Sequence, residues 1–186
     1  MDIKQLIGEA QLLFVGGKIE ESIAAFDRAL EAGADPFMVH LSVGVGYLKL
    51  KEVDNAIDSF SKATEVKSDH PRAYYYRGIA FLGKKEYEKA VSDLSRALEL
   101  KPDLHASRFA RAAAHARLRK LDEAVQDLRI VLPEMEANMR GFTDSYGILR
   151  TEMFEVIAQT GGGRGMPALG LAQKEMDIIN RWLQEE

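Results

Sequence analysis

The side chains best suited to chemistry form one basic run in the second half of the chain. The segment HASRFARAAAHARLRK contains no acidic residue and five cationic ones, which are Arg108, Arg111, Arg117, Arg119 and Lys120. A local basic patch of this kind could bind an anionic ligand, a lipid headgroup or nucleic acid. The whole chain has a net charge of −4, so we expect no nucleic-acid partner. We favour the alternative that Arg108 and Arg111 form ion pairs with acidic residues on neighbouring helices.

The other reactive residue types do not form a recognisable catalytic or metal-binding pattern. His40, His70, His105 and His115 are not surrounded by the carboxylates that a metal site needs, and the chain has no cysteine. The segment GGGRG at 161–165 lacks the Lys-Ser/Thr that follows in a phosphate-binding loop, so we interpret it as a flexible connector. No serine lies in a nucleophile elbow. We therefore expect a protein that is not an enzyme and that needs no metal and no cofactor.

The composition is that of one compact domain or of a short array of repeats. The chain has 186 residues, of which 46% are hydrophobic and 29% charged. No apolar run approaches the roughly 18 residues that span a bilayer. The start, MDIKQLIGEA, does not read as a signal peptide. We expect a cytoplasmic protein without a membrane span.

Most of the chain consists of one pattern of large and small residues that repeats at a constant spacing. Without any gap, it aligns four copies: Leu6, Glu9, Ala10, Leu13, Ser22, Phe26 and Ala29; His40, Val43, Gly44, Tyr47, Ala56, Phe60 and Ala63; Tyr74, Arg77, Gly78, Phe81, Ala90, Leu94 and Ala97; Arg108, Arg111, Ala112, His115, Ala124, Leu128 and Val131. The first four residues of each copy have the i, i+3, i+4, i+7 spacing of one helix face, and the rest belong to a second helix. Small residues such as Gly44 and Gly78 should let the two helices approach closely.

The pattern resembles that of the tetratricopeptide repeat, W-x2-L-G-x2-Y…A-x3-F…P, from about Asp2 to Asn138. The fourth copy departs most, because Arg108, Arg111 and His115 occupy positions that are normally apolar. The resemblance implies an all-α fold, a right-handed superhelical solenoid of antiparallel helix pairs. The predicted repeats are 3–36, 37–70, 71–104 and 105–138, followed by C-terminal capping helices in 139–186 with the connector 161–165.

The first helix of each copy carries a second apolar column, which by resemblance lines a concave groove that binds peptides or helices. The predicted groove consists of Ile7, Gln11, Phe14, Met38, Leu41, Val45, Leu48, Arg72, Tyr75, Tyr76, Ile79, Leu82 and Phe109. Tyr74 occupies the packing position of the family, so we expect Tyr75 and Tyr76 to contact the partner. Large exposed apolar surfaces usually mark interaction sites. The resulting hypothesis is an adaptor or scaffold that binds an apolar or amphipathic helical segment of another protein.

One known use of this groove is not expected here. Some members of the family clamp a C-terminal carboxylate with lysine, asparagine and arginine. The matching positions hold Ile7 and Gln11, then Ser42, then Arg72 and Tyr76, so only one basic residue remains. We expect this carboxylate clamp to be absent.

The tail beyond Arg140 is predicted to form two helices. The first begins at Thr143 or Asp144 and ends before Gly161, and the second has Leu169, Ala172, Met176, Ile179 and Leu183 on one face. We expect these helices to cap the end of the array. In two alternatives, the tail fills the groove of its own chain, or it enters the groove of a second copy and builds chains or rings. Pro133 should end or kink the helix that contains it.

Overall fold

The computed structural model of the chain describes residues 2–137, 147–159 and 171–184. This part of the chain contains ten α-helices and no strand, and no helix in it is long and apolar enough to cross a membrane. The helices are α1 (Ile3–Val15), α2 (Ile19–Glu31), α3 (Pro36–Lys49), α4 (Val53–Val66), α5 (Pro71–Gly83), α6 (Tyr87–Leu100), α7 (His105–Arg117), α8 (Leu121–Ala137), α9 (Ile148–Gln159) and α10 (Gln173–Gln184).

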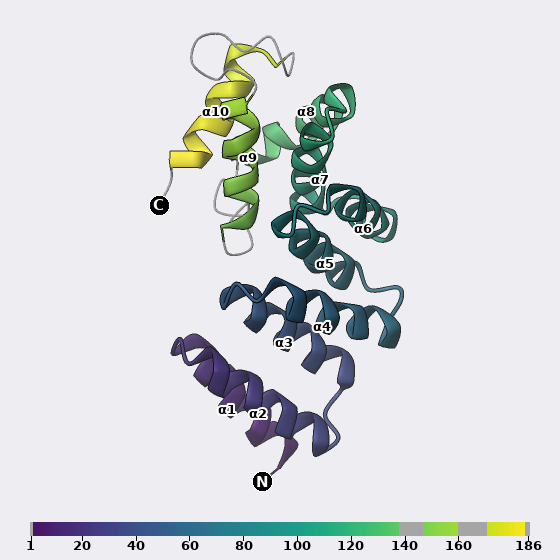
Figure 1. The fold of residues 1–186 in the computed structure, drawn as a ribbon, viewed down its shortest axis with the longest axis vertical. Helices are drawn as coiled ribbons and strands as arrows, with labels where there is room; N and C mark the ends of the chain where they lie inside the picture. Colours follow the sequence, from purple (N-terminus) through teal and green to yellow (C-terminus); the bar gives the residue numbers. More distant parts are fainter. Residues whose placement is uncertain (1, 138–146, 160–170, 185–186) are drawn as a thin grey trace.

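The first eight helices form four pairs that stack along one axis (Figure 1). The two helices of each pair pack against each other, and the second helix of each pair packs against the first helix of the next. The first pair, α1 and α2, lies at one end of this array, and α8 and α10 lie at the other (Figure 1). This arrangement confirms the predicted all-α solenoid. The residue ranges of the four repeats remain a prediction.

The repeat is visible in the backbone as well as in the side chains. The turn between the two helices of each pair contains one residue with a positive φ, at Gly17 (78°), Lys51 (63°), Lys85 (63°) and Arg119 (61°). These four positions are equivalent in the repeat. Only the first is glycine, although a positive φ is strained for other residues. The same turn geometry therefore aligns the helices of all four pairs.

One helix start follows a local sequence signal, and one expected helix end does not occur. The side chain of Asp35 accepts a hydrogen bond from the backbone N–H of Phe37 (3.0 Å), and Pro36 occupies the first turn of α3. Pro133 lies inside α8, which continues to Ala137, so the helix does not end at the proline. Because Pro133 is exposed, its ring does not disturb the core. The predicted start of the next helix at Thr143 or Asp144 and the connector 161–165 lie outside the described residues.

Two glycines permit the close contact between the helices of a pair. A Cβ atom added to Gly44 would lie 2.5 Å from the ring of Phe60, and one added to Gly78 would lie 2.7 Å from Cγ of Leu94. Phe60 and Leu94 are fully buried, so neither side chain has room to move away. In contrast, a Cβ atom added to Gly8 of α1 would meet nothing within 4 Å.

We predict that Gly78→Ala destabilises the protein by about 1–3 kcal/mol, because the added methyl group overpacks the contact with Leu94. The matched control is Gly8→Ala, which should stabilise α1 by about 0.5–1 kcal/mol through its higher helix propensity. Urea unfolding followed by circular dichroism measures both changes. If both substitutions changed the free energy of unfolding equally, an added methyl group at Gly78 would not be overpacked against Leu94.

Candidate functional site

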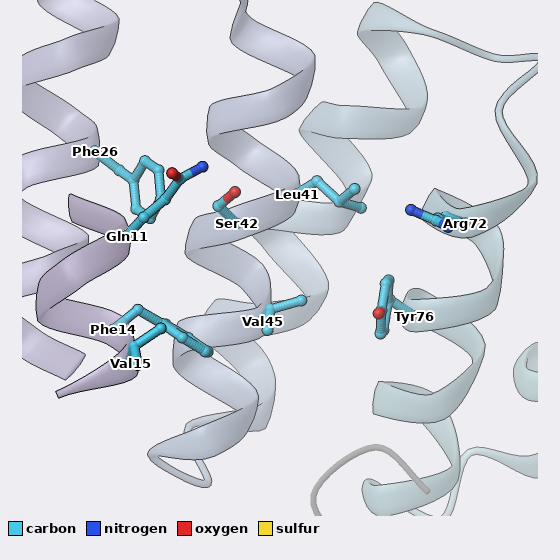
Figure 2. Close-up of a pocket in the computed structure, with 9 residues that line it drawn as sticks. All are labelled: Gln11, Phe14, Val15, Phe26, Leu41, Ser42, Val45, Arg72 and Tyr76. Carbon is cyan, nitrogen blue, oxygen red and sulfur yellow. The ribbon is translucent and has the colours of Figure 1, made fainter. Parts of the chain in front are cut away.

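The N-terminal half of the concave surface contains an open pocket with a volume of about 450 Å³. Helices α1, α3 and α5 line it, with a contribution from one residue of α2 (Figure 2). Its lining residues are Gln11, Phe14, Val15, Phe26, Leu41, Ser42, Val45, Arg72 and Tyr76. The volume lies in the range of protein sites that hold ligands, roughly 300–1,000 Å³. We call this feature the open half of the groove.

The open half has an apolar floor and a cationic rim. The ring of Tyr76 stacks on that of Phe60, with centroids 5.7 Å apart, and this contact holds the tyrosine at one wall. Arg72 is exposed beside Tyr76, and both side chains project from α5 (Figure 2). Lys49, at the end of α3, does not line the pocket, but its Nζ lies 4.9 Å from the ring centroid of the lining residue Phe14. Such a pocket suits a ligand that combines apolar and acidic groups.

Six of the predicted groove residues come together in the open half. They are Gln11, Phe14, Leu41, Val45, Arg72 and Tyr76. Ile7 and Met38 lie nearby, half-buried against the core of the first repeats. The predicted groove did not include the lining residues Val15, Phe26 and Ser42. Of these, Val15 could have been found from the sequence, since it follows Phe14 at the end of an apolar helix.

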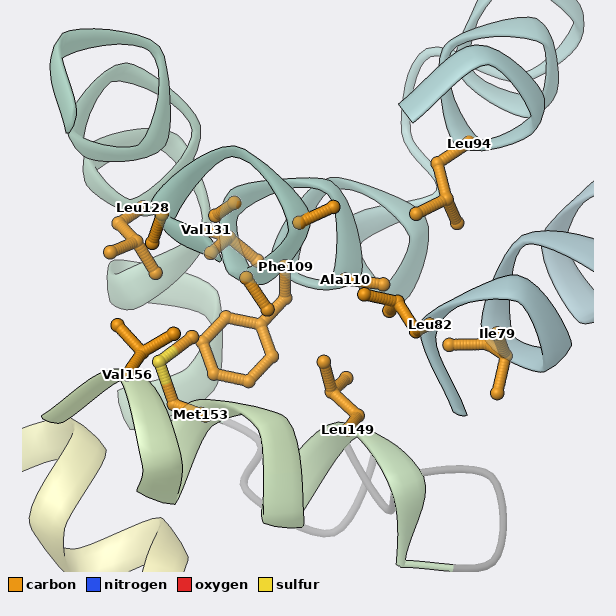
Figure 3. Packing of buried hydrophobic residues seen from close by; sticks show 14 of the residues in the cluster. Ile79, Leu82, Leu94, Phe109, Ala110, Leu128, Val131, Leu149, Met153 and Val156 are labelled. Carbon is orange, nitrogen blue, oxygen red and sulfur yellow. The ribbon is translucent and has the colours of Figure 1, made fainter. Parts of the chain in front are cut away.

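The C-terminal half of the concave surface is covered by the tail of the same chain. Helix α9 packs against α5 and α7. Its residues Leu149, Met153 and Val156 are buried in one cluster with Leu82 and Phe109 (Figure 3). From α10, Trp182 adds an edge-on contact with Phe109, with centroids 5.0 Å apart. The tail therefore occupies the groove, in addition to packing α10 against α8 at the end of the array.

This cover corrects the expected exposure of five predicted groove residues. Leu48, Tyr75, Ile79, Leu82 and Phe109 are at most 8% exposed. All five belong to one buried cluster, in which side chains of α9 and α10 cover the residues of α5 and α7, whereas Leu48 belongs to α3. A partner cannot reach them while the tail stays in place.

Of the three consecutive tyrosines, Tyr75 differs from the expectation. Tyr75 is buried, whereas Tyr74 and Tyr76 are half-buried. The hydroxyl of Tyr74 donates a hydrogen bond to the carbonyl of Ser68 (3.1 Å), so this tyrosine does have a structural role. Of the two tyrosines expected to contact a partner, only Tyr76 lines the open half.

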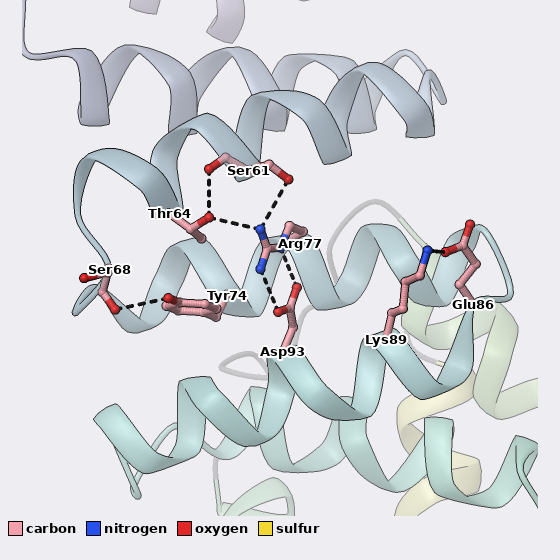
Figure 4. Close-up of polar contacts among 8 residues, drawn as sticks. All are labelled: Ser61, Thr64, Ser68, Tyr74, Arg77, Glu86, Lys89 and Asp93. Carbon is pink, nitrogen blue, oxygen red and sulfur yellow. Dashed lines mark hydrogen bonds and ion pairs between the residues drawn. The ribbon is translucent and has the colours of Figure 1, made fainter.

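The basic run does not form an open patch, because three of its five cations are paired. Arg111 donates two hydrogen bonds of 2.8 Å to Asp127 of α8, and Arg108 donates a weaker one of 3.4 Å to the same carboxylate. The preceding repeat has an equivalent pair, Arg77 and Asp93 (Figure 4). These pairs agree with the alternative that we favoured from the sequence. Only Arg119 and Lys120, at the turn before α8, are exposed.

Arg117 connects the groove to α9. Its Nε lies 3.3 Å from an oxygen of Glu152, its Nη1 lies 3.0 Å from an oxygen of Glu155, and its Nε donates a hydrogen bond to the hydroxyl of Tyr87 (2.9 Å). Burial raises the pKa of the Glu152 carboxyl, and the charge of Arg117 acts in the opposite direction. Sequence reasoning missed both glutamates. Their spacing of three residues beside an apolar helix face was the available signal.

The histidines do not assemble into a site. Burial lowers the pKa of His40, His70 and His115, and the three residues lie on different helix pairs or between them. Within the described residues, no group of three or more histidine, aspartate and glutamate side chains is arranged to hold a metal ion.

Comparison with known proteins identifies the family. The sequence pattern of the tetratricopeptide repeat matches residues 7–68 and 71–104, together just over half of the chain. The chain therefore belongs to the tetratricopeptide repeat family, as its resemblance indicated. A comparison with curated protein sequences gives no match.

Solved structures of other repeat proteins share the fold. A crystal structure of MamA has a TM-score of 0.69 at 16% identity, covering 98% of this chain and 90% of its own. YrrB, described as having an unusual peptide-binding site, has a TM-score of 0.67 at 23% identity with the same coverage. The first repeat domain of Spaghetti (RPAP3), bound to the HSP90 peptide SRMEEVD, has a TM-score of 0.53 at 22% identity and covers 72% of this chain and 93% of its own.

We predict that Arg117→Met destabilises the protein by about 3 kcal/mol near neutral pH, because the buried Glu152 loses its main partner. The pKa of Glu152 should then rise further above that of an unfolded glutamate. The folded variant would bind a proton at a higher pH than the unfolded chain does, so the loss of stability should shrink as the pH falls from about 7 toward 5.

Urea unfolding at several pH values tests this prediction, with Lys120→Met as the exposed control. A loss that does not change with pH would show that Arg117 stabilises the protein through its packing and not through Glu152.

Proposed function

We propose that this protein is a non-catalytic adaptor that holds an apolar or helical segment of a partner protein in the open half of its groove. The observation that carries the proposal is the difference between the two halves of one concave surface. The C-terminal half is covered by α9, whereas Phe14, Leu41 and Val45 stay uncovered in the N-terminal half. An uncovered apolar surface with a polar rim is typical of a protein interaction site.

The family supports an interaction role in general. YrrB and the Spaghetti domain are both described with bound or binding peptides, and their likeness to this chain lies in the fold. The positions that match the carboxylate clamp of other family members hold Ile7, Gln11, Ser42, Arg72 and Tyr76, and all of these except Ile7 line the open half. We therefore propose a ligand that is held mainly by its apolar face.

We predict that a double variant, Val15→Glu with Arg72→Glu, loses a partner that the wild-type protein captures. Both side chains line the open half and both are exposed, so the substitutions should alter the rim without disturbing the core. The measurement is a pull-down from cell lysate, quantified by mass spectrometry. We expect at least a tenfold loss of the specific partner.

The matched control is Lys62→Glu with Val66→Glu, which changes one exposed cation and one exposed valine on α4, outside the pocket. Circular dichroism should show the same helix content for both double variants. If the two variants lose the same proteins, or if the groove variant loses none, the open half is not the binding site.

A second candidate function is self-assembly, and one observation favours it. Leu12 on α1 is a large apolar side chain that is 76% exposed and does not line the pocket. Leu12 lies in a shallow surface depression, also lined by Gln5 and Glu9, on a face that the pocket does not include. The buried tail gives no support to the alternative in which it enters a second copy.

If self-assembly occurs through this face, light scattering should show a mass that grows with concentration, and Leu12→Glu should keep the protein monomeric. Lys62→Glu serves as the charge control. A constant monomer mass over the accessible concentration range would exclude self-assembly and leave the adaptor role.

A further inference from the structure

The tail shows what kind of segment this groove binds. Helix α9 presents Leu149, Met153 and Val156, a spacing of i, i+4, i+7, to the concave surface, and each of these side chains is at most 3% exposed. Beside this apolar face, Glu152 and Glu155 pair with Arg117 (Figure 3 shows the apolar contacts). The occupant of the covered half is therefore a helix with one buried apolar face and two glutamates beside that face.

The repeat places the same kind of surface in the open half. A step of two repeats along the chain relates four residues of the covered half to four residues near the N-terminus. The equivalent pairs are Leu82 and Phe14, Phe109 and Leu41, Ala113 and Val45, and Arg117 and Lys49. The first three open-half residues line the pocket, and Lys49 lies over Phe14 at its edge.

The two halves differ in what covers them. Leu82, Phe109 and Ala113 are fully buried beneath the tail, whereas Phe14, Leu41 and Val45 are only partly buried. The side chain of Arg117 is 10% exposed and holds two glutamates. Lys49 is exposed, and no carboxylate among the described residues pairs with it. The open half thus has the apolar floor and the cation of the covered half, without their occupant.

We propose that the open half binds an acidic amphipathic helix of a partner protein, which places apolar side chains at i, i+4 and i+7 on Phe14, Leu41 and Val45. A glutamate beside this apolar face pairs with Lys49, as Glu152 pairs with Arg117. Arg72, on the α5 wall of the pocket, provides a second cation for an acidic side chain on the other side of the bound helix (Figure 2). This inference rests on the proposed function and specifies the chemistry of its partner.

The probe is a peptide with the sequence of residues 147–159, GILRTEMFEVIAQ, which contains α9. A free peptide of this length would be a marginal helix in water. A hydrocarbon staple between positions 154 and 158, which are both exposed on α9, should hold it helical without touching its binding face. Binding to the full chain is measured by calorimetry, and the binding site is mapped by amide chemical shifts.

We expect the stapled peptide to shift the amides of α1 and α3, and Lys49→Glu to weaken its binding at least tenfold. A charge-swapped peptide, with lysine at both glutamate positions, should bind Lys49→Glu better than it binds the wild-type protein. This reciprocal preference would not arise if Lys49 had only a structural role. Lys62→Glu, on α4, is the matched control and should leave both affinities unchanged.

Three results would overturn the inference. They are an absence of binding, equal binding to the wild-type protein and to Lys49→Glu, and shifts confined to α7, which would mean that the peptide merely displaces α9. If the peptide fails while the lysate partner still depends on Val15 and Arg72, the proposed function stands and only the acidic helix is wrong. If both experiments fail, the open half is not a binding site.

Discussion

The close approach of the two helices in each repeat is the constraint on which the rest of this structure depends. In the second and third repeats, the ring of Phe60 and the side chain of Leu94 occupy the space that a Cβ atom would need at Gly44 and Gly78. Packed interiors leave little freedom to accommodate an extra group there. The contact therefore sets the distance between the paired helices. The turns at Lys51 and Lys85, which have the same backbone conformation, then reproduce this geometry from one pair to the next.

Regular stacking creates a concave surface with more apolar side chains than the repeats themselves can bury. The first helices line it with two sets of side chains, one that packs within the repeat and one that faces the groove. Burial of an apolar side chain contributes about 1.5–3 kcal/mol, so the second set favours any helix that can cover it. Helix α9 does so over α5 and α7, through Leu149, Met153 and Val156. Because α9 does not extend over α1 and α3, the surface is divided into a covered and an open half.

Ion pairs join helices within the array, and another ion pair joins the array to the tail. Within the array, Arg77 with Asp93 and Arg111 with Asp127 join the helices of the third and fourth pairs, and each arginine also donates a hydrogen bond to a serine of the preceding helix. Between the array and the tail, Arg117 of α7 forms an ion pair with Glu152 of α9. Removing a partner from such a pair leaves a charge with little water around it, which is costly. Arg108, Arg111 and Arg117 of the basic run are therefore part of the scaffold.

The fold of this protein could be predicted from the sequence because every repeat uses the same contacts over short separations. Gly44, Gly78, Ala90 and their equivalents recur at one spacing, and a helix pair with this spacing has few alternative ways to pack. The family and the helix pairs followed from this pattern, whereas Asp127, the acidic partner of Arg108 and Arg111, was not identified from the sequence. Six lining residues of the open half were also found, among them Phe14, Leu41 and Val45, whose spacing places them on the groove side of their helices.

Only the tertiary structure decided which part of the groove is accessible. The apolar face of α9 was compatible with capping the array, filling the groove or meeting a second copy, because amphipathic spacing identifies a buried face but does not identify what buries it. The same limit applies to the tyrosines. Their order on α5 showed that they point in different directions, but Tyr75 became a core residue and Tyr76 a pocket residue through contacts between segments distant in the chain. Periodicity determined the array, and long-range burial determined the site.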